Sequence, residues 1–221
     1  MVKMAKGIKP NAIMPNSNCA ACPRLNAFRV KNKSQFPEYF NAPVPSFGPI
    51  KAKILIAGLA PGLHGANQTG RPFTGDGAGE LLYPTLLKTG MAQGSYLARA
   101  DDGLELTIAR ITNAVRCVPP QNKVTGPEIA ACNGFLSAEI ASMDSLRAII
   151  ALGTVAHGAV LSAVGLKKSA FKFAHGAVFE LPKGILLADS YHCSRYNTNT
   201  GRLTTKMFED VFNNVLALTN G

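Results

Sequence analysis

The sequence has no apolar run as long as the about 20 residues that a membrane-spanning helix needs. The basic N-terminal stretch MVKMAKGIKPNAIM also lacks the continuous apolar segment of a secretory signal peptide. These absences argue against membrane and secreted proteins, so we expect a soluble cytoplasmic protein. Since 47% of its 221 residues are hydrophobic, the chain can build one sizeable core.

Acidic residues are also scarce. There are 13 Asp and Glu against 23 Lys and Arg, which gives a formal net charge of +10. Such an excess favours a polyanionic partner, nucleic acid first and an anionic membrane second. No basic amphipathic helix stands out, so we expect nucleic acid and no membrane partner. A basic enzyme without a polyanionic partner is the alternative.

Two common phosphate-binding motifs are missing. The P-loop pattern G-x-x-x-x-G-K-[ST] occurs nowhere, and G-x-G-x-x-G does not occur between a strand and a helix. The sequence therefore argues against a nucleoside triphosphate or dinucleotide site, even though a long glycine-rich segment follows the strand expected at 52–60.

Apolar strands and amphipathic helices alternate along the chain after residue 50. This pattern is typical of a three-layer α/β/α fold with a central, mostly parallel sheet, whose ligands bind at the carboxyl ends of the strands. We expect an irregular arm over residues 1–50 and one α/β domain over 51–221. The expected strands lie at 52–60, 106–117, 146–153, 171–181 and 184–192, and the helices at 78–90, 126–143, 154–165 and 204–218.

The chain has five cysteines, an odd number that argues against a disulfide framework in a chain without a signal peptide. Cys19 and Cys22 form a C-x-x-C pair in the arm, and Cys117 and Cys132 could complete a four-thiolate site. Such a site suits tetrahedral zinc or an iron–sulfur cluster, and the spacing leaves both open. The alternative is that Cys117 and Cys132 are ordinary core residues. We expect Cys193 to be a free thiol.

Three segments together resemble the uracil-DNA glycosylase superfamily. They are GLAPGLHGANQTGRPFTGDGAGELL (58–82), ITNAVRCVPPQNK (111–123) and ADSYHCSRYNTNTGRLT (188–204). With the four cysteines, the resemblance extends from Cys19 to about Thr204. GLAPG in place of a Glu-bearing GEAPG indicates family 5, the type B uracil-DNA glycosylases.

The resemblance implies a monofunctional, monomeric DNA glycosylase of base excision repair that flips uracil out of double-stranded DNA, and it leaves single-stranded DNA open as a second substrate. It also implies a [4Fe–4S] cluster, in preference to zinc, on Cys19, Cys22, Cys117 and Cys132. A non-catalytic nucleic-acid-binding protein of the same fold is the alternative function. A zinc-stabilised nucleotide-processing enzyme is a third hypothesis.

The resemblance also assigns roles to residues around the flipped base. Phe73 would stack on the base, and the amide of Asn113 would match the uracil edge. Ala60 stands where other members hold a water-activating acid. Asp76 is the only acid in the loop before the helix at 78–90, and we expect it to orient the water and stabilise the cationic sugar. His192, as neutral imidazole, would stabilise the departing base.

A second role is possible for Asp76, and three further loop residues have expected roles. Asp76 could instead cap the following helix, and both roles can hold together. Gly62 stands where uracil-specific members have a Tyr that excludes thymine. It therefore predicts a wider pocket that also accepts hypoxanthine and xanthine. We expect His64 to line this pocket and Asn122 to contact the substrate or the abasic product.

The segment RYNTNTGRLT is expected to contact DNA. In the resembling proteins this loop enters the minor groove, which makes Arg195 and Tyr196 candidate wedge residues and Arg202 a candidate phosphate ligand. The alternative is an ordinary solvated loop. Cys193 replaces the proline common at this point of the motif, so the loop is expected to be less rigid.

Overall fold

The structure is a computed structural model, and it describes residues 13–219. Its main sheet has five strands in the order β4-β1-β5-β7-β6, and every pairing is parallel except that of β6 with β7. The expected three-layer fold with a mostly parallel sheet is confirmed. The strands, in sheet order, are Ala109–Asn113, Ile54–Gly58, Ala148–Leu152, Ile185–Ser190 and Val178–Leu181.

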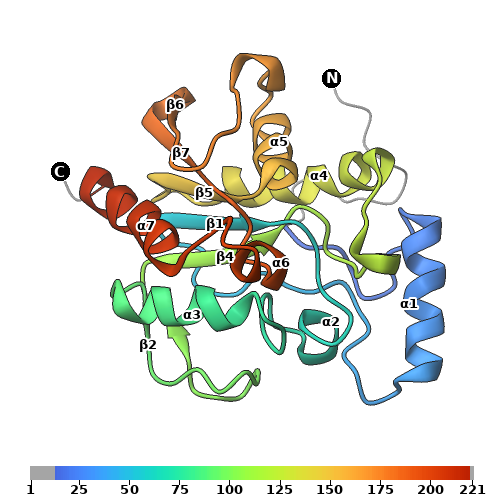
Figure 1. Cartoon of the computed structure of the whole chain (residues 1–221). Coiled ribbons are helices and arrows are strands. Elements are labelled where there is room, and N and C mark those ends of the chain that lie inside the picture. The colour runs from blue at the N-terminus through green and yellow to red at the C-terminus, as the bar shows by residue number, and fades with distance from the viewer. Residues whose placement is uncertain (1–12, 220–221) are drawn as a thin grey trace.

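The two faces of the sheet are covered by different pairs of helices (Figure 1). In β1, Ile54 and Ile56 belong to the core beneath α3 and α7, whereas Leu55 and Ala57 belong to the core beneath α4 and α5. Because successive side chains of a strand point to opposite faces, a strand covered on both sides is apolar throughout. The four covering helices are α3 (Gly79–Lys88), α4 (Gly126–Ala141), α5 (Thr154–Ala163) and α7 (Thr205–Thr219).

None of the helices within residues 13–219 combines the length and the apolar character needed to cross a membrane.

Several short elements connect the strands and the covering helices. The short elements are α2 (Ala66–Thr69), the β2 (Ala92–Gln93) and β3 (Glu105–Leu106) hairpin, α6 (Arg195–Asn199), and three 3₁₀ turns at Pro120–Asn122, Lys168–Ala170 and Pro182–Gly184.

The strand expected over 171–181 is wrong for its first half. Only Val178–Leu181 pairs with β7, while residues 171–177 form an irregular loop with one turn at His175 and Gly176. Gly176 adopts a φ of +79°, a left-handed conformation that ends strand geometry. Its amide instead donates to the carbonyl of Asp189 at 2.8 Å, which fastens this loop to the end of β7.

The arm is more ordered than the sequence predicts. It contains the 13-residue helix α1 (Pro23–Gln35), which stands beside the sheet domain in Figure 1. Only Leu25, Arg29 and Asn32 of this helix are buried, and two of them are polar, so no apolar periodicity marks it. Further along, Phe47 exchanges two backbone hydrogen bonds with Ile111, which adds the arm to the free edge of β4.

A buried carboxylate joins β4, the segment after it and α4. Glu139 has no exposed side-chain surface and accepts from Arg110 Nε at 2.6 Å, Arg116 Nη2 at 2.6 Å and Thr112 Oγ1 at 2.8 Å. The neighbouring Arg116 and Arg110 hold the pKa of Glu139 below its usual value despite the opposing effect of burial. Arg116 also donates to Ser46, so the network reaches the arm.

Replacing Glu139 with Ala should lower the free energy of unfolding by about 3–5 kcal/mol, because it leaves two buried guanidinium groups without their carboxylate. Urea unfolding measures this loss. The control is Glu180→Ala on the exposed side of β6, for which we expect a change within about 0.5 kcal/mol. Equal losses in the two variants would contradict a structural role for the network.

Candidate active site

One pocket opens at the carboxyl ends of β1, β4 and β7, where ligands of parallel sheets bind. Its inner part is bounded by Phe73, Asn113, Asp76 and His192, and its outer part by Asp76, His192 and Asn122. Thus the loop after β1, the last residue of β4 and the segment after β7 meet here. Other residues that line it are Leu59, Ala60, Pro61, Gly62, Ala66, Gly77, Ala78, Pro119, Ser194 and Arg195.

Asp76 is held from two sides. Its Oδ1 accepts the backbone N–H of Ala78 at 3.1 Å, a side-chain bond of the turn that precedes the helix. The N-cap of α3 is Ala78, which forms no side-chain capping bond, so Asp76 is not the helix cap that the sequence allowed. Its Oδ2 lies against Gly62 and Gly65, where an added Cβ would come within 2.9 and 2.4 Å of that oxygen. The carboxylate therefore both stabilises the turn before α3 and lines the pocket. Sequence reasoning singled out Gly62 for pocket width, but nothing in the sequence indicated the contact of Gly65.

Phe73 and His192 form one wall of the pocket. Their rings are stacked with centroids 5.9 Å apart and an interplanar angle of 27°. Phe73 is 6% exposed and has a φ of +55°, an unusual conformation for a large side chain that is often found at functional sites. It approaches β1 so closely that a Cβ on Gly58 would lie 2.4 Å from its ring. A glycine is therefore required at the end of β1.

The imidazole of His192 is a neutral group at physiological pH. Burial lowers its pKa below the ordinary 6.5, and the nearby Asp76 carboxylate only partly opposes this effect. A neutral imidazole can donate one N–H to a developing negative charge without first losing a proton.

Asn113 has an unused hydrogen-bonding atom at the inner end of the pocket. The residue is 3% exposed, and its Oδ1 has no hydrogen-bond partner among the residues that the structure describes. An unpaired buried polar atom is costly unless a ligand satisfies it. At the outer rim, Asn122 and its neighbour Gln121 both adopt left-handed φ values, of 56° and 55°. The Asn122 backbone is therefore held in an uncommon conformation beside the pocket.

Two of the expected contacts lie elsewhere. His64 does not line the pocket: its Nδ1 is 3.0 Å from the Tyr39 hydroxyl, and its ring packs edge-on against Phe36. Arg202 lies over the ring of Tyr191, with its guanidinium carbon 4.6 Å from the centroid. This contact gives Arg202 a packing role, which its place in the motif did not indicate.

The other two expected DNA contacts are on the surface. Arg195 begins α6 and reaches Glu80 at 2.9 Å in an exposed ion pair. Tyr196 follows it and is 72% exposed. A large aromatic side chain so exposed beside the pocket mouth is suited to contact a binding partner.

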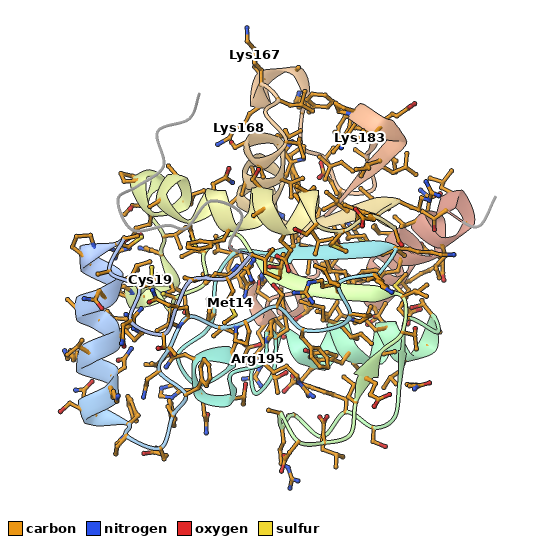
Figure 2. All side chains as sticks on the ribbon, turned by 180° about the vertical axis from the view of Figure 1, so that it is seen from behind. Met14, Cys19, Lys167, Lys168, Lys183 and Arg195 are labelled. Atoms are coloured by element: carbon orange, nitrogen blue, oxygen red, sulfur yellow. The ribbon has the colours of Figure 1, made fainter. Side chains whose placement is uncertain are left out.

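The four cysteines expected to bind a metal surround one cavity between the arm and α4. Cys19 lies near the start of α1 (Figure 2), Cys22 precedes that helix, Cys117 follows β4, and Cys132 is on α4. Within residues 13–219, no three or more Cys, His, Asp or Glu side chains are arranged so that they could hold a metal ion. Cys193 is fully buried in the core beneath α3 and α7, away from this group.

The surroundings of these thiols suit a negatively charged group. Arg29 is 6% exposed, and its Nη1 donates to Cys117 Sγ at 3.3 Å. Burial raises the pKa of Cys22 to about 11 and that of Cys117 to about 12. Since metals bind thiolates, a metal would have to displace protons here, and a buried guanidinium would compensate the resulting charge.

Comparison with known proteins identifies the class to which this fold and pocket belong. The family model described as "Uracil DNA glycosylase superfamily" matches residues 45–216. The chain therefore belongs to the uracil-DNA glycosylase superfamily.

Relatives with curated names refine this assignment. A "Type-5 uracil-DNA glycosylase" of Thermus thermophilus is 48% identical over 198 residues, which cover 87% of this chain and 90% of the relative. One of Pyrobaculum aerophilum is 40% identical, with coverages of 90% and 88%. A "Type-4 uracil-DNA glycosylase" of the latter organism is 34% identical over 67% of this chain and 62% of the relative. The expected family 5 is confirmed, and the chain is a DNA glycosylase of the uracil-DNA glycosylase type.

Replacing Gly62 with Ala should slow base release at least tenfold, because the new Cβ would lie 2.9 Å from Asp76 Oδ2 and displace the carboxylate. Single-turnover excision from a uracil-containing duplex measures the rate. The control is Gly134→Ala on α4, where an added Cβ meets nothing within 4 Å. This control should keep the wild-type rate, and an unchanged rate in Gly62→Ala would show that the carboxylate position is not critical.

Proposed function

We propose that the chain is a monofunctional glycosylase in which Asp76 orients the attacking water. The observation that carries the proposal is the convergence of Asp76, His192, Phe73 and Asn113 on one pocket. An anion, a neutral donor, an aromatic wall and an amide are the groups that hydrolysis of a flipped-out nucleotide requires.

In the proposed reaction the C1′–N bond breaks first, and the water oxygen then bonds to C1′ of the resulting sugar cation. The electron pair of that bond leaves with the base, and the carboxylate of Asp76 accepts a proton from the water. The same negative charge stabilises the sugar cation before attack. The neutral imidazole of His192 donates a hydrogen bond to the base as its negative charge develops, so the base can leave without prior protonation.

Recognition of the base is assigned to Phe73 and Asn113. Stacking on an aromatic ring contributes about 1–3 kcal/mol per base. The unpartnered Oδ1 of Asn113 can accept N3–H of uracil, while its Nδ2 can donate to O4. Because the pocket lining includes small residues, among them Ala60, Gly62 and Ala66, we extend the proposal to hypoxanthine and xanthine.

Cys19, Cys22, Cys117 and Cys132 are proposed to hold a [4Fe–4S] cluster. All four line one cavity, and Arg29 donates to one of them. We prefer a multi-iron cluster to zinc because Cys117 and Cys132 lack the close C-x-x-C spacing that zinc ribbons use on both sides. The cluster would supply stability by joining α1 to α4, and no step of base release is assigned to it.

The proposal predicts abasic product without strand cleavage. A panel of duplexes, each with one uracil, hypoxanthine, xanthine or thymine, is incubated with excess enzyme, and the products are compared before and after alkali. We expect uracil, hypoxanthine and xanthine release, with the strand intact until alkali is added. Strand cleavage without alkali would contradict the monofunctional reaction, and release of uracil alone would contradict the wider pocket.

Cys132→Ser should reduce bound iron and lower the melting temperature, because it removes one ligand from the core end of the proposed cluster. Elemental analysis and thermal unfolding of the purified protein measure both effects. Cys193→Ser is the matched cysteine control and should retain iron. One zinc per chain without iron in the wild type would contradict the cluster assignment.

A further inference from the structure

The backbone that carries His192 lies beyond the sheet. β7 ends at Ser190, and backbone groups of the next two residues form hydrogen bonds with side chains instead of with a neighbouring strand. The Tyr191 amide donates to His175 Nδ1 at 3.1 Å, and Asn197 Nδ2 donates to the His192 carbonyl at 2.8 Å. The peptide linking Tyr191 to His192 is thus flanked by two side-chain hydrogen bonds.

The hydrogen bond from Tyr191 fixes the protonation state of His175. A backbone N–H can only donate, so Nδ1 of His175 must carry a lone pair and the ring must be neutral. The ring is also stacked on Tyr191, with centroids 5.0 Å apart and an interplanar angle of 19°. His175 therefore contacts both the amide and the side chain of the residue before His192.

We propose that neutral His175 is a positioning residue, which sets the direction of His192 by accepting the amide hydrogen of Tyr191. The inference rests on the role proposed above for His192 in base release. The loop that carries His175 is held in place without the Tyr191 bond, because Asp189 exchanges backbone hydrogen bonds with Gly176 and Ala177, at 2.8 and 2.9 Å. The acceptor is therefore held at a fixed place beside the end of β7.

Protonation of His175 would turn the acceptor into a donor and break this bond. The groups that face the ring are Tyr191 and, from α7, the Met207 backbone and the Asp210 carboxylate, with Arg202 on the Tyr191 ring. Burial lowers the pKa of His175, and the Met207 and Asp210 interactions oppose this without reversing it. The positioning bond is thus complete above pH 6.5 and is lost as the pH falls through the lowered pKa.

Two variants separate the acceptor from the rest of the ring. His175→Asn places an amide oxygen near the position of Nδ1, and this acceptor does not titrate. His175→Phe keeps a ring to stack on Tyr191 but has no acceptor. Single-turnover uracil release is measured from pH 5 to pH 8 for both and for the wild type, with melting temperatures recorded alongside.

We expect His175→Phe to release uracil at least tenfold more slowly at pH 7.5, and His175→Asn to stay within about threefold of the wild type. On the acid side of the pH–rate profile, the slope of the logarithm of the rate against pH should be smaller by one in His175→Asn than in the wild type, because one fewer protonation slows release. Wild-type rates in His175→Phe, or identical acid limbs in His175→Asn and wild type, would overturn the proposal.

A spectroscopic measurement keeps the test independent of catalysis. The ¹⁵N–¹H resonance of Tyr191 should titrate below pH 6.5 in the wild type and stay constant in His175→Asn. A resonance that titrates equally in both proteins would refute the acceptor role. If the resonance behaves as expected while His192→Ala retains full activity, the proposed role of His192 fails and the His175 contact stands.

Discussion

The site depends on the confinement of one carboxylate by backbone. Gly62 and Gly65 lie so close to Asp76 Oδ2 that a side chain on either would clash with this oxygen. The Ala78 amide donates a hydrogen bond to Oδ1. A short polar side chain held by a main-chain N–H and two glycines has little freedom to reorient. Such pre-organisation lets an anion stabilise a developing cation without rearrangement during the reaction.

Asp76 and His192 lie in different environments within the pocket. Asp76 faces the opening lined by Asn122 and Arg195, whereas His192 is half-buried and stacks against Phe73. Burial keeps the imidazole neutral, and proximity to Asp76 does not reverse that effect. In the proposed reaction this arrangement would place a fixed anion beside the sugar and a neutral donor beside the base, and each suits one side of the bond that breaks.

The sequence predicts those parts of the protein whose physical cause is local. The apolar runs that became β1 and β5 are unambiguous because both faces of the sheet are covered. Helix α1 could not be recognised, since it buries only three residues and carries no apolar stripe. The pocket residues came from motif resemblance, and the sequence could not show that His64 contacts Tyr39 or that His175 reaches Tyr191. These contacts join segments far apart in the chain, so no local spacing reports them.

The most direct test of the central claim is the single-turnover rate of uracil release by Asp76→Asn at saturating enzyme. Asn preserves the shape and can still accept from Ala78, but it cannot accept a proton from water or neutralise a cation. The account predicts at least a hundredfold slower release with duplex affinity within about threefold of the wild type. A wild-type rate in this variant would contradict it.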